Sequence, residues 1–125
     1  MRTILIFCGL ILAGVIAWIL VARPFADHYG PAFRGLGRVE LGGLLDRPSD
    51  HLKKDVRTRG TVTTQCPGCG CWFFVKDARG LELRVEFGDT CPMLPIRRGR
   101  MATLEGQLIR FGEGYEFVAT AAEFD

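Results

Sequence analysis

Four cysteines near the middle of the chain are the residues whose type and spacing could do chemistry. Cys66, Cys69 and Cys71 lie within six positions, and Cys91 follows 20 positions after Cys71. Thiolates are ligands that Zn²⁺ and Cu⁺ prefer, because both ions are soft enough to bind sulfur strongly. The sequence therefore predicts a zinc or copper site with Cys66, Cys69, Cys71 and Cys91 as the candidate metal ligands.

The same four cysteines fit two other kinds of chemistry. In an oxidising compartment, cysteines of a small domain pair as disulfides, which would staple loops without binding metal. The segment Cys-Pro-Gly-Cys at residues 66–69 also has the spacing of a redox-active dithiol. Reactive dithiols place the first thiol at a helix N-terminus, whereas this segment lies between two predicted strands. All three chemistries remain open from the sequence, and the redox dithiol has the weakest support.

Five segments after the N-terminal region have the alternation or β-branched content of strands. They are residues 55–64, 70–76, 81–87, 100–110 and 115–124. Gly60, in the middle of the first segment, predicts a bulge or sharp bend. Five strands with the longest connection between the third and the fourth are typical of an OB-fold barrel. The predicted fold class is all-β, a five-stranded OB-fold barrel preceded by a single N-terminal transmembrane helix and a short helical segment.

This strand order explains how distant cysteines would meet. In an antiparallel meander the first and third strands run in the same direction. Cys66 follows the first strand and Cys91 follows the third, so both are expected at one end of the barrel. Gly68 and Gly70 permit the positive φ angles that a loop needs to wrap around an ion.

The N-terminus predicts attachment to a membrane. Residues 4–22 form an uncharged, apolar run of 19 residues, close to the length that crosses a bilayer as a helix. We divide the chain into an anchor at residues 1–23, a linker at 24–40 and an OB-fold domain at 41–125. Counting Arg2 against Arg23, Arg34 and Arg38 favours a cytoplasmic domain. The very short tail before the run favours the opposite orientation, and we expect the barrel in the periplasm.

Two sequence stretches resemble a known group of proteins. The stretch "LLDRPSDHLKKDVRTRGTV" resembles the entry to exported bacterial OB-fold domains of the tRNA-anticodon-binding-like type. The stretch "GCWFFVKD" resembles the Gly-Cys-Trp second strand of a small uncharacterised family within that group. This resemblance covers roughly residues 44–124, and it implies a barrel fold and an envelope location without a settled activity.

A weaker resemblance links the chain to the CcmE-type haem chaperones of cytochrome c maturation. It is carried by the order of Pro92, Leu94, Arg98, Gly99, Glu105 and Gly106. Those chaperones attach haem through a histidine in a C-terminal motif. Here the two histidines, His28 and His51, precede the barrel, so haem is not supported as a cofactor.

The net charge and the absence of catalytic motifs reduce the number of possible functions. With 16 Lys+Arg against 14 Asp+Glu, the net charge of +2 does not demand a nucleic-acid partner. If an oligonucleotide face existed, it would combine Trp72 and Phe73 with the arginines at positions 97, 98 and 100. We find no Ser/His/Asp set and no phosphate loop, so an enzyme is not expected.

The sequence thus predicts a membrane-anchored OB-fold binding or accessory protein of the cell envelope, with metal or thiol chemistry at the cysteine cluster. One alternative is a structural module of an envelope protein complex, with loops stapled by disulfides. The other is a domain that binds nucleic acid or another anion.

Overall fold

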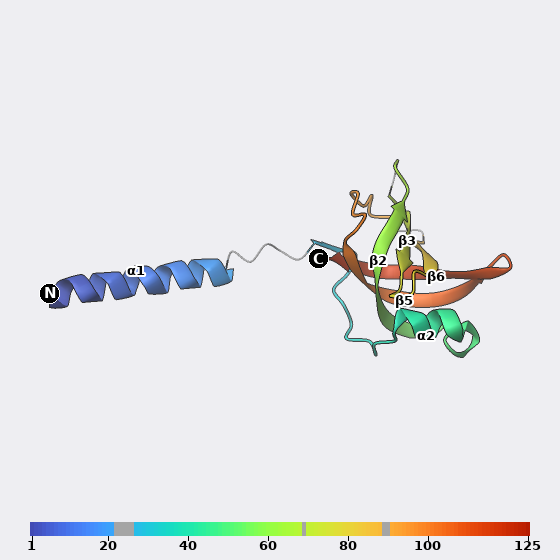
Figure 1. The fold of residues 1–125 in the computed structure, drawn as a ribbon, viewed down its shortest axis with the longest axis horizontal. Coiled ribbons are helices and arrows are strands. Elements are labelled where there is room, and N and C mark those ends of the chain that lie inside the picture. The colour runs from blue at the N-terminus through green and yellow to red at the C-terminus, as the bar shows by residue number, and fades with distance from the viewer. Residues whose placement is uncertain (22–26, 69, 89–90) are drawn as a thin grey trace.

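The computed structural model describes residues 1–21, 27–68, 70–88 and 91–125 (Figure 1). Its elements in chain order are α1 (Arg2–Val21), β1 (Asp27–Tyr29), α2 (Leu41–Asp46), the 3-10 turn η1 (Pro48–Asp50), β2 (Asp55–Gln65), β3 (Trp72–Lys76), β4 (Glu82–Glu86), β5 (Met101–Phe111) and β6 (Gly114–Phe124). The five predicted strand segments correspond to β2 to β6, with ends that differ by one or two residues. The short helical segment predicted before the first strand is present as α2 and η1.

Strands β2 to β6 close into a barrel. Neighbouring strands follow the order β6-β4-β3-β2-β5, and β5 pairs again with β6. Strand β4 runs parallel to β6, and the other pairs are antiparallel, so the barrel is mixed. Strand β1 lies outside the barrel and pairs with the end of β6, with Asp27 opposite Phe124. The predicted five-stranded barrel is confirmed, and the sixth strand is an addition to it.

The long strand β2 serves both halves of the barrel. Its first half pairs with β5, its second half pairs with β3, and Thr61 is opposite both Lys76 and Met101. Gly60 precedes this point, as expected for a strand that must bend. A β-carbon at Gly60 would lie 2.8 Å from Leu41 and 2.9 Å from Val75, so the core leaves no room for a side chain there.

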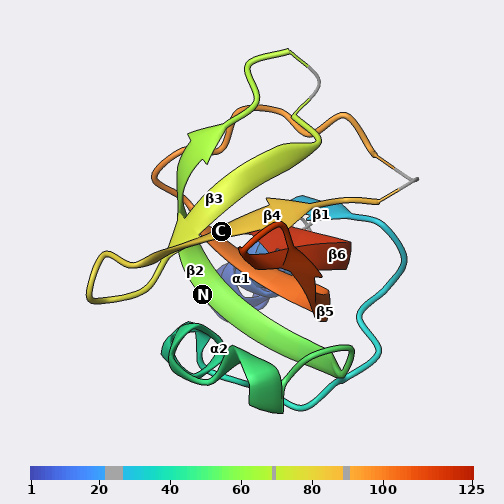
Figure 2. The same ribbon diagram turned by 90° about the vertical axis from the view of Figure 1, so that its right-hand side faces the viewer.

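The core follows from the alternation of side chains along each strand. In β3, Phe73 and Val75 are fully buried, whereas Trp72 and Phe74 face outward and are half-buried. Helix α2 lies against one end of the barrel (Figure 2) and buries Leu44. The largest fully buried side chains of the barrel strands and the loop after β4 are Phe73, Phe87, Phe117, Leu104 and Leu108.

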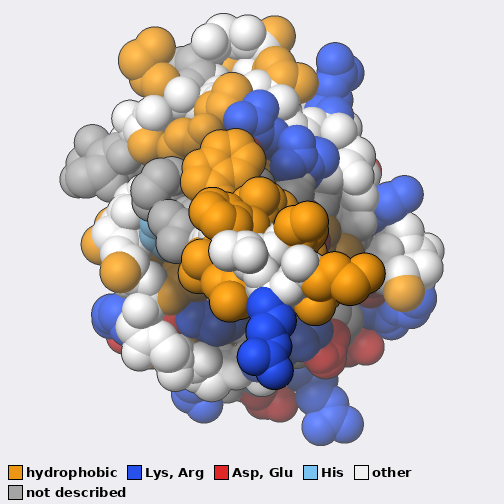
Figure 3. Space-filling model, turned by 90° about the vertical axis from the view of Figure 1, so that its left-hand side faces the viewer, with side chains coloured by type: hydrophobic (Ala, Val, Ile, Leu, Met, Phe, Trp, Pro, Cys, Tyr) orange, Lys and Arg blue, Asp and Glu red, His pale blue; other side chains and the backbone are white. Residues whose placement is uncertain are grey.

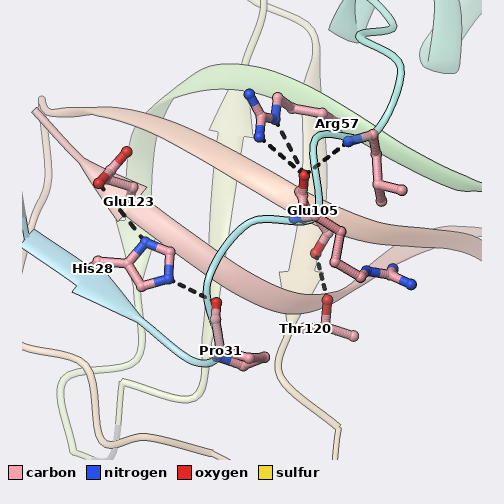
Figure 4. A network of polar contacts seen from close by, with 8 residues as sticks. His28, Pro31, Arg57, Glu105, Thr120 and Glu123 are labelled. Atoms are coloured by element: carbon pink, nitrogen blue, oxygen red, sulfur yellow. Dashed lines mark hydrogen bonds and ion pairs between the residues drawn. The ribbon is translucent and has the colours of Figure 1, made fainter.

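The predicted linker, residues 24–40, is packed on the barrel over its described part, from residue 27 onward. A carboxylate on β5 holds it there (Figure 4). Glu105 is only 1% exposed and accepts hydrogen bonds from the backbone N–H groups of Arg34, at 2.7 Å, and Leu36, at 3.2 Å. Arg57 donates to the same carboxylate from Nε, at 3.3 Å, and Nη2, at 3.1 Å. The glycine- and proline-rich composition suggests a tether, but it cannot reveal an acceptor about 70 residues away.

Burial and hydrogen bonding act on Glu105 in opposite directions. Burial by itself would raise the pKa of the Glu105 carboxyl, because a charge is costly in a low-dielectric environment. The hydrogen bonds from Arg34, Leu36 and Arg57 outweigh burial, and the pKa lies below its ordinary value. The ionised form of Glu105 is therefore the one that the fold stabilises.

Helix α1 carries apolar side chains on every side. Its large side chains from Ile4 to Trp18 are between 49% and 73% exposed. Figure 3, which views the molecule from the N-terminal end, shows apolar side chains in the centre, with charged side chains mainly around the rim.

The predicted transmembrane helix is not found: none of the helices in the described residues is long and apolar enough to cross a membrane.

Candidate functional site

Three of the four candidate cysteines lie at one end of the barrel, as the strand order predicts. Cys71 and Cys91 form a disulfide, with their Cα atoms 5.2 Å apart. Cys66 follows β2 directly, and its backbone N–H donates to the carbonyl of Trp72 at 3.0 Å. Cys69 lies outside the described residues. The loop after β2 is therefore joined covalently to the loop after β4.

The disulfide changes what these cysteines can bind. A disulfide sulfur is not a thiolate, and a thiolate is the form that ligates zinc or copper. The predicted set of Cys66, Cys69, Cys71 and Cys91 therefore does not supply four thiolates in this state. Among the residues that the structure describes, no group of three or more His, Cys, Asp or Glu side chains is arranged to hold a metal ion. Of the three chemistries left open by the sequence, disulfide formation is shown for one pair.

Hydrogen bonds add to the covalent link between the two loops. Gln65 is 6% exposed; its amide group donates to the carbonyl of Pro95 and accepts from the backbone N–H of Arg97, both at 2.8 Å. Gly70 has a φ of 68° and lies against the Leu94 carbonyl, where a β-carbon would overlap it. Gln65 is not among the predicted site residues, because a single glutamine at a strand end belongs to no motif.

Beside the disulfide, the outer face of the barrel carries an arginine between aromatic rings. Trp72 and Phe74 of β3 make an edge-to-face contact, with ring centroids 6.1 Å apart. The guanidinium of Arg84 lies 5.3 Å from the centroid of the Trp72 ring and 5.4 Å from that of Phe111, in the range of cation–π attraction. We call Trp72, Phe74, Arg84 and Phe111 the aromatic face. Because Trp72 follows Cys71 directly, the disulfide also fixes one edge of this face.

A buried carboxyl group supports the aromatic face from β6. Arg84 Nε donates to Glu116 at 2.9 Å, and Arg84 also lies 3.6 Å from Glu86. Burial raises the pKa of Glu116, the nearby Glu86 raises it further, and the bond from Arg84 acts in the opposite direction. Carboxyl groups with raised pKa values concentrate at functional sites, although ion-pair networks also produce them.

Neither Arg84 nor Glu116 is among the candidate site residues predicted from the sequence. The contact arises from the parallel pairing of β4 with β6, in which Arg84 is opposite Glu116. No local pattern of residues signals that pairing.

The oligonucleotide face considered from the sequence is not assembled as such. Phe73 is fully buried in the core. Arg97 forms an ion pair with Asp27, and Arg100 donates to the backbone carbonyl of Asp125. The outward-facing aromatic side chains of β3 are instead Trp72 and Phe74, because alternation turns Phe73 inward.

Comparisons with known proteins identify the fold and nothing finer. No family model matches the chain, and no curated protein matches it. The specific resemblances to anticodon-binding-like domains and to haem chaperones thus gain no support. Among solved structures, the chain is similar to that of the hypothetical protein ygiW from E. coli, with a TM-score of 0.53 and 13% sequence identity. The match covers 77% of this chain and 95% of that one. At this identity the similarity establishes a shared OB-fold-like barrel alone.

Proposed function

We propose that this protein is an exported, lipid-attached binding module whose recognition surface is held rigid by a disulfide. The observation that carries the proposal is the Cys71–Cys91 bridge. Disulfides form and persist in oxidising compartments and are rare in the cytosol. The bridge therefore supports a barrel on the outer side of the cytoplasmic membrane, in the periplasm.

Helix α1 supplies the argument for lipid. A helix that is apolar on all sides belongs in a protein core or in a membrane. The side chains of α1 from Ile4 to Trp18 are exposed, and Arg2 carries the one ionisable side chain in the first turn. We propose that lipid covers this surface.

The aromatic face supports a role in recognition rather than catalysis. Trp72 and Phe111 present ring surface to solvent, and Arg84 is fixed between them by Glu116. Aromatic and arginine side chains are the residues that contribute most to binding at protein interfaces. We propose another component of the cell envelope as the partner.

One experiment in intact cells tests both export and lipid attachment. We expect the full chain to sediment with membranes and to carry the Cys71–Cys91 bridge. After thiols are trapped in acid and alkylated, tryptic residues 60–76 should be recovered linked to residues 85–97. The matched variant carries Leu12→Arg and Val15→Arg, which place two charges on the exposed apolar surface of α1, where contact with lipid would make them costly.

The variant should leave the membrane fraction, and it should lose the bridge because its barrel stays in a reducing compartment. Recovery of the wild-type chain with reduced Cys71 and Cys91 would refute export. Recovery of the wild-type chain in the soluble fraction would refute lipid attachment.

Metal binding is a second candidate, for the reduced state alone. The fold brings the loops that carry Cys66, Cys71 and Cys91 to one end of the barrel, so reduction would release two thiols at the end that also carries Cys66. We expect the oxidised protein to take up no zinc after dialysis, and the reduced protein to take up about one equivalent. Elemental analysis with a parallel thiol count measures both. A reduced wild-type protein that takes up no zinc, or a Cys91→Ser variant that takes up as much as the wild type, would exclude the site.

A further inference from the structure

A pocket lies between helix α2, the middle of β2 and the turn that joins β3 to β4. Its volume is about 750 Å³. Figure 2 shows α2 and this turn on the same side of the barrel. Arg79, in the turn, donates to Asp77 in the turn and to Asp46 at the end of α2, both at 2.9 Å. Arg79 therefore connects the two walls of the pocket, and its charge is already balanced.

The remaining charges in the pocket are mainly positive. Arg38, Arg59 and Lys76 line it together with one further acid, Glu40. Glu40 lies 3.5 Å from Arg38 and is 80% exposed, so it only partly offsets that charge. Lys76 forms no ion pair with any described residue. Like charges gathered around one hollow raise the local concentration of anions.

Among the residues that line the pocket, Arg59 points most specifically to an anionic ligand. Its Nε atom is buried and has no hydrogen-bond partner among the described residues. A buried donor without a partner is costly. The Arg59 side chain as a whole is 38% exposed and lines the pocket, so its other N–H groups are available to an acceptor there. Among the described residues, the acidic partner of Arg59 is Asp125, which is 3.5 Å from Nη2 and is itself largely exposed. The planar guanidinium groups of arginine match the oxygen atoms of phosphate and carboxylate groups.

The pocket also has apolar walls. Leu41 of α2 and Met101 of β5 line it, and Gly60 contributes backbone without a side chain. A fully hydrated inorganic ion would not use these surfaces. We infer that the pocket binds a small organic molecule that joins an oxyanion, such as a phosphate group, to an apolar part. This inference adds a ligand site to the proposed binding module, and it depends neither on the disulfide nor on lipid attachment.

Titration of the full chain in a nonionic detergent with phenyl phosphate and with inorganic phosphate tests the inference. We expect phenyl phosphate to bind more tightly than inorganic phosphate. Its affinity should fall as salt is added, because salt screens the attraction between the charges. Arg59→Gln and Lys76→Gln should each lower the affinity for phenyl phosphate by about fivefold or more, because each removes one cationic contact. Lys76 is exposed, so its substitution leaves the fold intact and keeps the test valid if Arg59→Gln is unstable.

Arg110→Gln is the matched control, because Arg110 lies outside the pocket and its guanidinium stacks on Tyr115. It should leave the affinity unchanged. Equal losses in Arg110→Gln and Lys76→Gln would mean that the anion responds to overall charge, and the site would be refuted. Equal affinity for phenyl phosphate and inorganic phosphate would refute the apolar part of the proposal. No binding of either probe would refute the pocket as an anion site, and it would leave the cellular test of export unaffected.

Discussion

Replacing Cys71 and Cys91 together with serine is expected to lower the free energy of unfolding by about 3 kcal/mol. The two residues are 20 positions apart, and a bridge that closes a loop of this size restricts the unfolded chain by about that amount. Urea unfolding of the oxidised proteins, followed by Trp72 and Trp18 fluorescence, measures the difference. The double variant is preferred to Cys91→Ser alone, because it leaves no new thiol to exchange with the remaining cysteines.

Cys8→Ser is the control for this measurement. Cys8 is exposed on α1, so its replacement should leave the stability of the barrel unchanged. The double variant should also lose order around Trp72, which follows Cys71 and forms one edge of the aromatic face. Equal stabilities of the wild type and the double variant would show that the bridge does not hold the loops, and the rigid recognition surface would lose its basis.

Replacing Glu105 with glutamine is expected to lower the free energy of unfolding by about 2–4 kcal/mol. The substitution removes a buried carboxylate from Arg57, which is 29% exposed, and leaves at least one buried N–H group without an acceptor. Glu105 accepts from Arg34, Leu36 and Arg57, and a glutamine offers one acceptor oxygen in place of two. The segment from residue 31 to 40 should detach more often from the barrel, and hydrogen exchange at the amides of Arg34 and Leu36 should accelerate.

The pH dependence of the same variant gives an independent check. The pKa of Glu105 is lowered in the folded protein, so its stabilisation is present above the unfolded value, near 4.5, and is lost as the pH falls through the folded pKa. The stability difference between the wild type and Glu105→Gln should therefore be full at neutral pH and shrink below pH 4.5. The carboxyls of Asp27, Asp55 and Asp77 also have lowered pKa values, but they are present in both proteins and cancel in the difference.

Glu113→Gln serves as the matched control, because Glu113 is exposed in the turn between β5 and β6. It should change stability by less than about 0.5 kcal/mol, as is usual for surface substitutions. A Glu105→Gln protein as stable as this control would show that the N-terminal segment is held by other contacts.

The strands could be predicted from the sequence because their signal is local. Alternation between residues 81 and 87 places Leu83 and Val85 on one face and Glu82, Arg84 and Glu86 on the other, and that period requires no knowledge of distant residues. The order of the five strands and the long third connection were then enough to predict the barrel. The same order predicted that the loops with Cys66 and Cys91 would meet at one end.

The chemistry of the cysteines could not be predicted in this way. Thiols with this spacing suit a metal site or disulfides equally well, and the choice depends on which Cα atoms approach to 5.2 Å. That distance is set by the path of residues 91–97, whose anchors are Gln65 and the close approach of Gly70 to Leu94. These contacts join positions 24 to 32 residues apart, so they produce no periodic pattern in the sequence.

Taken by itself, the sequence determined which segments are apolar, where the strands alternate and which side chains carry charge, because these are properties of neighbouring residues. The tertiary structure alone decided which charges are buried and what they contact. Glu105 and Glu116 look like any surface glutamate in a strand, yet both are almost completely buried against arginines from other strands. Barrel closure creates those neighbours, since the pairings of β5 with β2 and of β6 with β4 bring together residues that are far apart along the chain.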